Sequence, residues 1–263
     1  MSHGGQCGVE WDEWQVIRAL VPANATVLEL GARFGTTSCV LSEAVGRDGF
    51  VVAVEPDASV HASLMHNLHS HRCSNVHVLK GTVGSRPMRI AERAGFGGVG
   101  TRTALASSSS DVGALPHVSV RRINSHLGRS IDTLLLECAA RASNPDEACP
   151  LSFKDQRVRG SCEGCIETLL SSDADVEPLM RHLKLILIEQ DGRNVSYAKF
   201  WPQLQSRGFV RVWRSHAWYS PQIVHSAWLR GVAAGSNAAC EAHRSRARLS
   251  KRELPCAADA APD

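Results

Sequence analysis

Two glutamates and two glycines lie at spacings that suit a site for a nucleotide-type ligand. Glu29 lies near the end of an apolar run and is followed by Gly31 and Gly35, and Glu55 ends a second apolar run. On a parallel sheet, the glycines let the backbone lie against a ligand, and the helix that begins near Thr36 points its N–H groups at it. We expect the Glu55 carboxylate to accept hydrogen bonds from ribose hydroxyls.

The spacing of the glycines discriminates between ligands. A dinucleotide-binding loop has glycine at its first, third and sixth positions so that a pyrophosphate can sit on the helix, whereas the third position here is Arg33. The Gly-x-x-x-Gly spacing therefore favours S-adenosylmethionine (SAM) over NAD, with Glu29 placed to hold an ammonium group. Two alternatives stay open: a tight turn that binds no ligand, and an NAD-dependent oxidoreductase, which Arg33 opposes.

Strands and helices alternate along the chain. Apolar runs predict strands at 26–30, 50–55, 76–79, 131–136 and 183–188, and periodicity predicts helices at 11–20, 37–45, 57–68 (capped by Asp57) and 197–207. Residues 209–213 and 223–229 are expected to form a closing antiparallel pair. This order predicts an α/β fold with a doubly wound parallel sheet. We interpret 84–116 as a long mobile connection or lid, because it is rich in glycine, serine and arginine.

The composition fits one folded domain with a tail. The chain has 263 residues, 43% of them hydrophobic, and its net charge of +3 gives no clear sign of a nucleic-acid partner. We expect residues 1–234 to form the domain and 235–263, with five basic residues between His243 and Arg252, to form a disordered basic tail. A cytoplasmic location is expected, because no signal peptide or membrane span is recognisable.

The cysteines and histidines are not expected to bind metal. The nine cysteines are irregularly spaced, which favours reduced thiols in an intracellular protein over a disulfide framework. Cys162 and Cys165 form a lone C-x-x-C without a second pair at zinc-site spacing. The histidines at 61, 66, 69 and 71 crowd one predicted helix, but its apolar stripe (60, 64 and 68) leaves them on the solvated face.

Three motifs resemble those of the FkbM-type SAM-dependent O-methyltransferases, over about residues 16–230. They are Val-Leu-Glu-Leu-Gly-Ala-Arg-Phe-Gly-Thr-Thr-Ser at 27–38, Ala-Val-Glu-Pro at 53–56 and Gly-Thr-Val-Gly at 81–84. The resemblance implies a class I methyltransferase fold: a mostly parallel, seven-stranded Rossmann-like sheet with an antiparallel C-terminal strand. It also implies O-methylation of a hydroxyl on a small-molecule or sugar-like acceptor. The implied SAM-binding residues are Glu29, Gly31, Ala32, Phe34, Gly35, Glu55, Pro56, Gly81 and Thr82.

A fourth motif of that family is interrupted in this chain. Leu134–Cys138 supplies its strand and Cys162–Leu170 supplies its acidic turn and helix, so that 139–162 is either an insertion or a retained intron. A loop of this length adds little closure entropy, but it separates groups that would position the acceptor. The interruption favours an alternative function, a catalytically impaired relative that serves as a binding or scaffold protein.

The acceptor side of the predicted site offers three candidates for a general base. Methyl transfer from a sulfonium is an in-line displacement, so the enzyme mainly has to align a hydroxyl oxygen with the methyl carbon. A base within hydrogen-bond reach of that hydroxyl assists the reaction. Glu137 is the first candidate, Glu163 the second and His126 the third.

Overall fold

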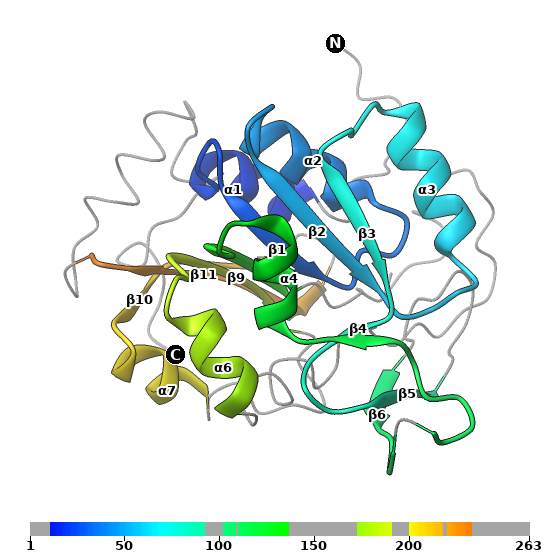
Figure 1. Cartoon of the computed structure of the whole chain (residues 1–263). Coiled ribbons are helices and arrows are strands. Elements are labelled where there is room, and N and C mark those ends of the chain that lie inside the picture. The colour runs from blue at the N-terminus through cyan, green and yellow to red at the C-terminus, as the bar shows by residue number, and fades with distance from the viewer. Residues whose placement is uncertain are drawn as a thin grey trace.

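Seven strands form one sheet that runs through the middle of the molecule (Figure 1). The computed structural model describes residues 11–92, 102–108, 110–136, 173–190, 200–217 and 220–232. The sheet order is β10-β11-β9-β8-β1-β2-β3. Its strands are β1 (Thr26–Leu30), β2 (Phe50–Glu55), β3 (Val76–Lys80), β8 (Thr133–Leu136), β9 (Leu185–Gln190), β10 (Phe209–Ala217) and β11 (Ser220–Arg230).

The strand directions confirm the predicted fold class. Neighbouring strands from β3 through β2, β1 and β8 to β9 are parallel, whereas β11 is antiparallel to both β9 and β10. Every residue of β1 and β8 is buried, as expected for parallel strands that are covered on both faces. The protein therefore has an α/β, Rossmann-like fold in which the last strand runs against the others.

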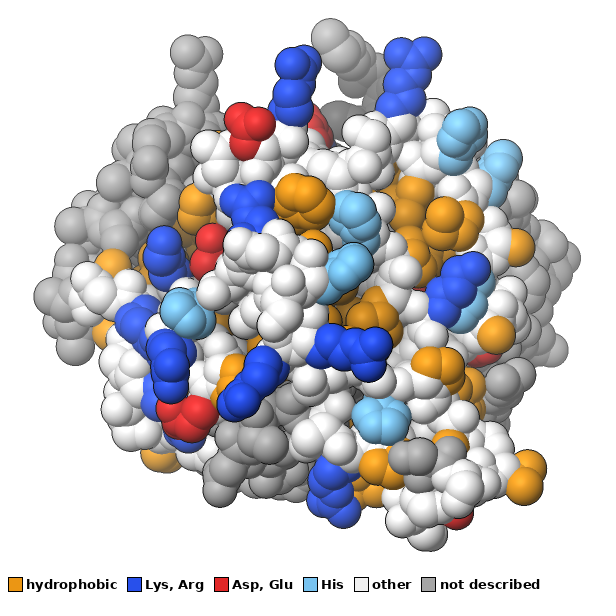
Figure 2. All heavy atoms as spheres, in the orientation of Figure 1, with side chains coloured by type: hydrophobic (Ala, Val, Ile, Leu, Met, Phe, Trp, Pro, Cys, Tyr) orange, Lys and Arg blue, Asp and Glu red, His pale blue; other side chains and the backbone are white. Residues whose placement is uncertain are grey.

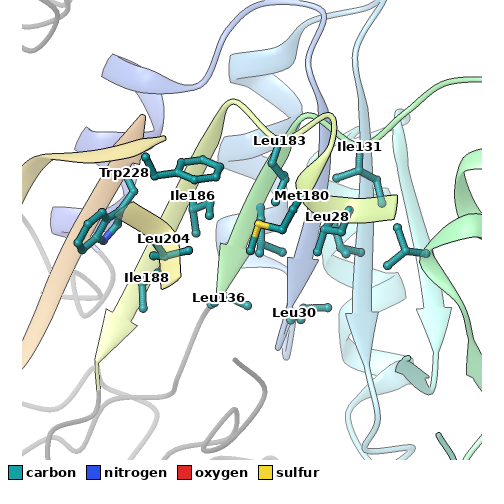
Figure 3. Packing of buried hydrophobic residues seen from close by; sticks show 14 of the residues in the cluster. Leu28, Leu30, Ile131, Leu136, Met180, Leu183, Ile186, Ile188, Leu204 and Trp228 are labelled. Carbon is teal, nitrogen blue, oxygen red and sulfur yellow. The ribbon is translucent and has the colours of Figure 1, made fainter. Parts of the chain in front are cut away.

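Helices cover both faces of this sheet. One face packs against α1 (Trp11–Leu20), α2 (Thr36–Val45) and α3 (His61–Ser70), and the other against α4 (Val120–Leu127), α6 (Asp173–Met180) and α7 (Trp201–Ser206). Alternate residues of a strand point to opposite faces, so Leu134 and Leu136 enter one core cluster and Leu135 enters the other. Figure 3 shows the first cluster, in which Met180 of α6 and Leu204 of α7 pack over the strands.

Two helices differ from the prediction, one in its start and one in its existence. The third predicted helix begins at His61 instead of Asp57, because the Asp57 carboxylate accepts the Ser59 N–H (3.0 Å) and closes a separate turn before the helix. Helix α4 was not predicted, although its ends carry recognisable signals. The Ser119 hydroxyl accepts the Arg122 N–H, and Gly128 has the left-handed conformation that often ends a helix.

The described residues of 84–116, which we interpreted as a long mobile connection or lid, form strands that the sequence did not predict. The segment contains two strands, β5 (Met88–Glu92) and β6 (Arg102–Leu105), which pair as an antiparallel ribbon. The ribbon is anchored by buried Met88, whose carbonyl accepts the Leu115 N–H (2.7 Å). On either side, β4 (Thr82–Val83) pairs with β7 (His117–Val118) and holds the two ends of the segment together. The strands are short and contain arginines, so the sequence shows no clear alternation of apolar and polar residues there.

The expectation that the cysteines are reduced thiols is wrong for two of them. Cys39 in α2 and Cys73 in the turn after α3 form a disulfide, with their Cα atoms 5.5 Å apart. Two cysteines that are 34 residues apart in the sequence meet because α2 and α3 pack side by side on the same face of the sheet. The disulfide therefore joins two consecutive β–α units.

Several predictions concern residues outside the described ranges. The insertion at 139–162, the basic tail at 235–263 and the C-x-x-C at 162–165 all lie there, and they stay predictions. None of the described helices is long and apolar enough to cross a bilayer. On the face shown in Figure 2, Lys and Arg side chains are interspersed with histidine, hydrophobic and uncharged side chains.

Removal of the Cys39–Cys73 disulfide is expected to lower the free energy of unfolding by about 3–4 kcal/mol, because the bond closes a long loop in the unfolded chain. The measurement is denaturant unfolding of the oxidised wild type and of the double variant Cys39→Ser/Cys73→Ser. As a control, dithiothreitol should destabilise the wild type and leave the double variant unchanged. Equal stability of the two oxidised proteins would contradict the bond's role.

Candidate functional site

The predicted site residues gather at the carboxyl ends of β1 and β2. Strand β1 is followed in the chain by its neighbour β2 on one side, while its neighbour on the other side is β8. The order in which strands are added to the sheet therefore reverses at β1. Ligands of open α/β sheets bind outside the carboxyl ends of the strands at such a point. The glycine loop (residues 31–35) follows β1 at this point.

Backbone hydrogen bonds fix the glycine loop over the end of β2. The N–H groups of Gly31 and Ala32 both donate to the carbonyl of Val54, at 3.0 and 3.1 Å. The Gly35 N–H then donates to the Ala32 carbonyl, which turns the chain into α2. Gly35 itself has φ +78°, and a Cβ there would lie 2.7 Å from a Leu64 methyl. The glycine permits both the left-handed turn and the close packing of α2 on α3.

The carboxylate of Glu55 connects this loop to the end of β2. One carboxylate oxygen accepts the Arg33 N–H (2.9 Å) and the other accepts the Asp57 N–H (2.7 Å). Burial raises the pKa of the Glu55 carboxyl above its ordinary value, and the two N–H donors partly offset this effect by stabilising the charged form. A carboxylate has about four acceptor positions, so each oxygen retains capacity for a further donor.

The carboxylate of Glu29 braces the start of α2. Glu29 is fully buried, and one of its oxygens accepts the Ser38 hydroxyl at 2.6 Å. The bond ties the end of β1 to the first turn of the helix behind the glycine loop. The assignment of Glu29 to an ammonium group stays a prediction.

The turn after β3 lies beside the same strand ends. The Gly81 N–H donates to the Glu55 carbonyl (3.1 Å), and the Thr82 N–H donates to the Pro116 carbonyl (2.9 Å). Gly81 has φ +155°, and a Cβ there would lie 2.2 Å from the Pro116 oxygen. Only glycine fits this crossing of two backbones, which brings Thr82 next to the end of β2.

The remaining predicted cofactor residues also lie at this edge. Ala32 is buried, while Phe34 and Pro56 are half-buried. The carbonyl of Phe34 accepts a hydrogen bond from the Asn67 side chain (2.9 Å) in α3, so the tip of the glycine loop is held in place. The structure thus brings together all nine residues that the resemblance implied, although their contact with a cofactor stays a prediction.

Two residues contribute to the site in ways the sequence did not reveal. A ring nitrogen of His61 lies 2.9 Å from the Glu55 carbonyl, so this histidine supports the end of β2 instead of lying on the solvated face with His66. Asp57 is buried and supplies one of the two N–H donors to Glu55. Hydrogen bonds of this kind depend on loop geometry, and no spacing rule predicts them.

The candidate bases are only partly within the described residues. Glu137 and Glu163 lie outside them. Strand β8 ends at Leu136, which pairs with Leu30 of β1 at the start of the glycine loop. His126 is exposed in the last turn of α4.

Comparison with protein-family models and with curated protein sequences found no match. Among solved structures, the fold is similar to that of Aeropyrum pernix fibrillarin with bound SAM (12% identity, 82% of this chain and 73% of that chain, TM-score 0.43). It is also similar to an O-methyltransferase from Bacillus cereus in complex with SAH (11%, 83% and 80%, TM-score 0.45). A third similar structure is a protein in the NADB-Rossmann superfamily from Streptococcus agalactiae (14%, 85% and 70%, TM-score 0.46). At these identities and TM-scores, we assign no activity from likeness and argue function from the residues themselves.

Gly81→Ala is expected to destabilise the fold far more than Gly84→Ala, which makes a matched control. Both glycines have nearly the same φ (+155° and +152°), so the backbone strain of about 1–3 kcal/mol is shared. A Cβ at Gly81 also meets the Pro116 backbone, whereas the nearest atom to one at Gly84 is 4.0 Å away. Thermal unfolding of both variants measures the difference, and equal losses would show that the close approach at Gly81 does not exist.

The raised pKa of Glu55 predicts a pH dependence of stability. Between the ordinary and the raised pKa, the native state binds more protons than the unfolded state, so the free energy of unfolding falls as pH rises through this weakly acidic window. Above the raised pKa the loss is complete and the profile is flat. Unfolding of wild type and Glu55→Gln across this window isolates the contribution as the difference between the two profiles. A difference that rises with pH would mean that the folded pKa is lowered.

Proposed function

We propose that this chain is a SAM-dependent methyltransferase of the FkbM type that methylates a hydroxyl of a small-molecule or sugar-like acceptor. The observation that carries the proposal is the Glu55 carboxylate, which is buried at the end of β2 and fixed by two backbone N–H groups beside the glycine loop. A ribose presents two neighbouring hydroxyl donors. The free acceptor positions of a fixed, charged carboxylate suit them.

The shape of the glycine loop supports SAM over a dinucleotide. Arg33 occupies the third position of the loop and has φ +45°, so a side chain projects where a dinucleotide-binding loop would have glycine. The sheet supports the same choice. The dinucleotide-binding order 3-2-1-4-5-6 contains six strands, whereas here the additional antiparallel strand β11 separates β9 from β10.

The residues of the site divide into those that face the cofactor and those that hold them. We assign binding of the ribose to Glu55. Backbone contact with the cofactor is assigned to Gly31, Ala32 and Phe34, and contact with the adenine to Gly81 and Thr82. Glu29 and Gly35 position the loop and α2, through the Ser38 hydrogen bond and the left-handed turn. SAM supplies an electrophilic methyl group on a sulfonium.

The chain's own contribution to the reaction is alignment and removal of one proton. Bound SAM would supply the methyl carbon and its sulfur would keep the electron pair of the broken carbon–sulfur bond, so the chain has to align the acceptor oxygen with that carbon. The hydroxyl proton passes to a base, for which we propose Glu137, directly after β8, with Glu163 in support. Glu137 directly follows Leu136 in the sequence, and Leu136 pairs with Leu30 at the start of the glycine loop.

Calorimetric titration with SAM tests the proposal. Glu55→Ala should weaken binding by about 1.5–3 kcal/mol, the value of hydrogen bonds to a charged acceptor, and Glu55→Gln should weaken it less. Glu43→Ala is the control, because Glu43 is exposed on α2 and forms a surface ion pair with Arg18. Unchanged SAM affinity in Glu55→Ala, or tighter binding of NADH than of SAM by the wild type, would overturn the assignment.

A further inference from the structure

Two carboxylates and an imidazole meet in the core, away from the glycine loop. Glu13 of α1, Glu189 of β9 and His225 of β11 are all buried, with 5%, 4% and 3% of their side chains exposed. One potential ligand atom from each lies within 4.8 Å of the other two. We call this cluster the buried triad. Although the three residues are far apart in the sequence, the fold converges them on one point.

The fold places the buried triad where α1 packs on the sheet. Glu189 and His225 are paired neighbours on β9 and β11, so their side chains point to the same face. That face is covered by α1, whose residues Ile17 and Leu20 belong to the same core cluster as Leu187 of β9. Glu13, one turn before Ile17, therefore points towards the pair.

The distances within the buried triad do not suit a hydrogen-bonded ion pair. Nε2 of His225 lies 3.6 Å from a carboxylate oxygen of Glu13 and 3.8 Å from one of Glu189. Both separations exceed the usual 2.7–3.2 Å of an N–H···O hydrogen bond. Neither ring nitrogen of this nearly fully buried histidine makes a hydrogen bond in the structure. A buried imidazole in that position ordinarily has a partner.

The same distances suit atoms that share a metal ion. Zn²⁺ binds histidine nitrogen and carboxylate oxygen at about 2.0–2.2 Å, so two such ligands on a tetrahedral ion lie about 3.4 Å apart. The nitrogen–oxygen separations of the buried triad are only slightly longer than this. A dication would also offset the negative charge of two carboxylates that are buried beside this imidazole.

We propose that Glu13, Glu189 and His225 form a binding site for one divalent transition-metal ion. Zn²⁺ suits both the ligand types and their spacing. One imidazole and two carboxylates supply three of the four positions that zinc usually takes. The ion joins the first helix to the antiparallel strand β11 and stabilises the packing of α1. The site uses no residue assigned to SAM and does not depend on the proposed function.

Metal analysis of the purified full-length protein tests the site directly. After removal of loosely bound ions, we expect about one Zn²⁺ per chain, and a strong chelator should lower Tm by several degrees that added Zn²⁺ restores. His225→Gln should weaken zinc binding more than about 100-fold and abolish both effects of chelator and zinc on Tm. His66→Gln, which changes an exposed histidine of α3, is the matched control and should behave like the wild type.

Cobalt substitution distinguishes this site from a cysteine site elsewhere in the chain. Co²⁺ bound by the buried triad should give visible bands without a sulfur-to-metal charge-transfer band in the near ultraviolet. Three results would overturn the proposal: a wild type with no metal and a Tm indifferent to zinc and chelator, a sulfur band in the cobalt protein, or equal zinc affinity in His225→Gln. The wild-type measurements decide the matter even if His225→Gln fails to fold.

Discussion

Glu55 is the residue on which the geometry of the candidate site depends. Its carboxylate accepts N–H groups from Arg33 and Asp57, and its carbonyl oxygen receives the Gly81 N–H and lies 2.9 Å from a ring nitrogen of His61. One residue thus fixes the loops that follow three adjacent strands. Burial of a carboxylate is costly unless its oxygens are hydrogen-bonded. The same hydrogen bonds therefore fix the positions of the loops and offset the cost of burying the Glu55 carboxylate.

The sheet was predictable because its evidence is local in the sequence. Runs such as 27–30 and 133–136 are apolar at every position but one, and the change to helical periodicity between them indicates parallel strands. The glycine loop was predictable for the same reason. Helix α4 also carries local signals, in Ser119 and Gly128, but its short length and few apolar residues concealed them.

The parts that could not be predicted depend on contacts between distant segments. The Cys39–Cys73 disulfide requires the packing of α2 on α3, and the ribbon of β5 and β6 requires the pairing of β4 with β7 at its base. The buried triad is the extreme case, because Glu13 and His225 come from opposite ends of the described chain. A pattern in a single sequence does not predict that residues so far apart will be in contact.

The position of β11 also affects how the chain is made. β11 is synthesised after β10, yet it lies between β10 and β9, so β9 has an unpaired edge until β11 has emerged from the ribosome. Synthesis from Gln190 to Arg230 takes about 2–8 s at 5–20 residues per second. During this time the apolar run of β9 offers free N–H and C=O groups to other nascent chains. A polypeptide stalled before Ser220 would keep that edge open and become a target for chaperones and proteases.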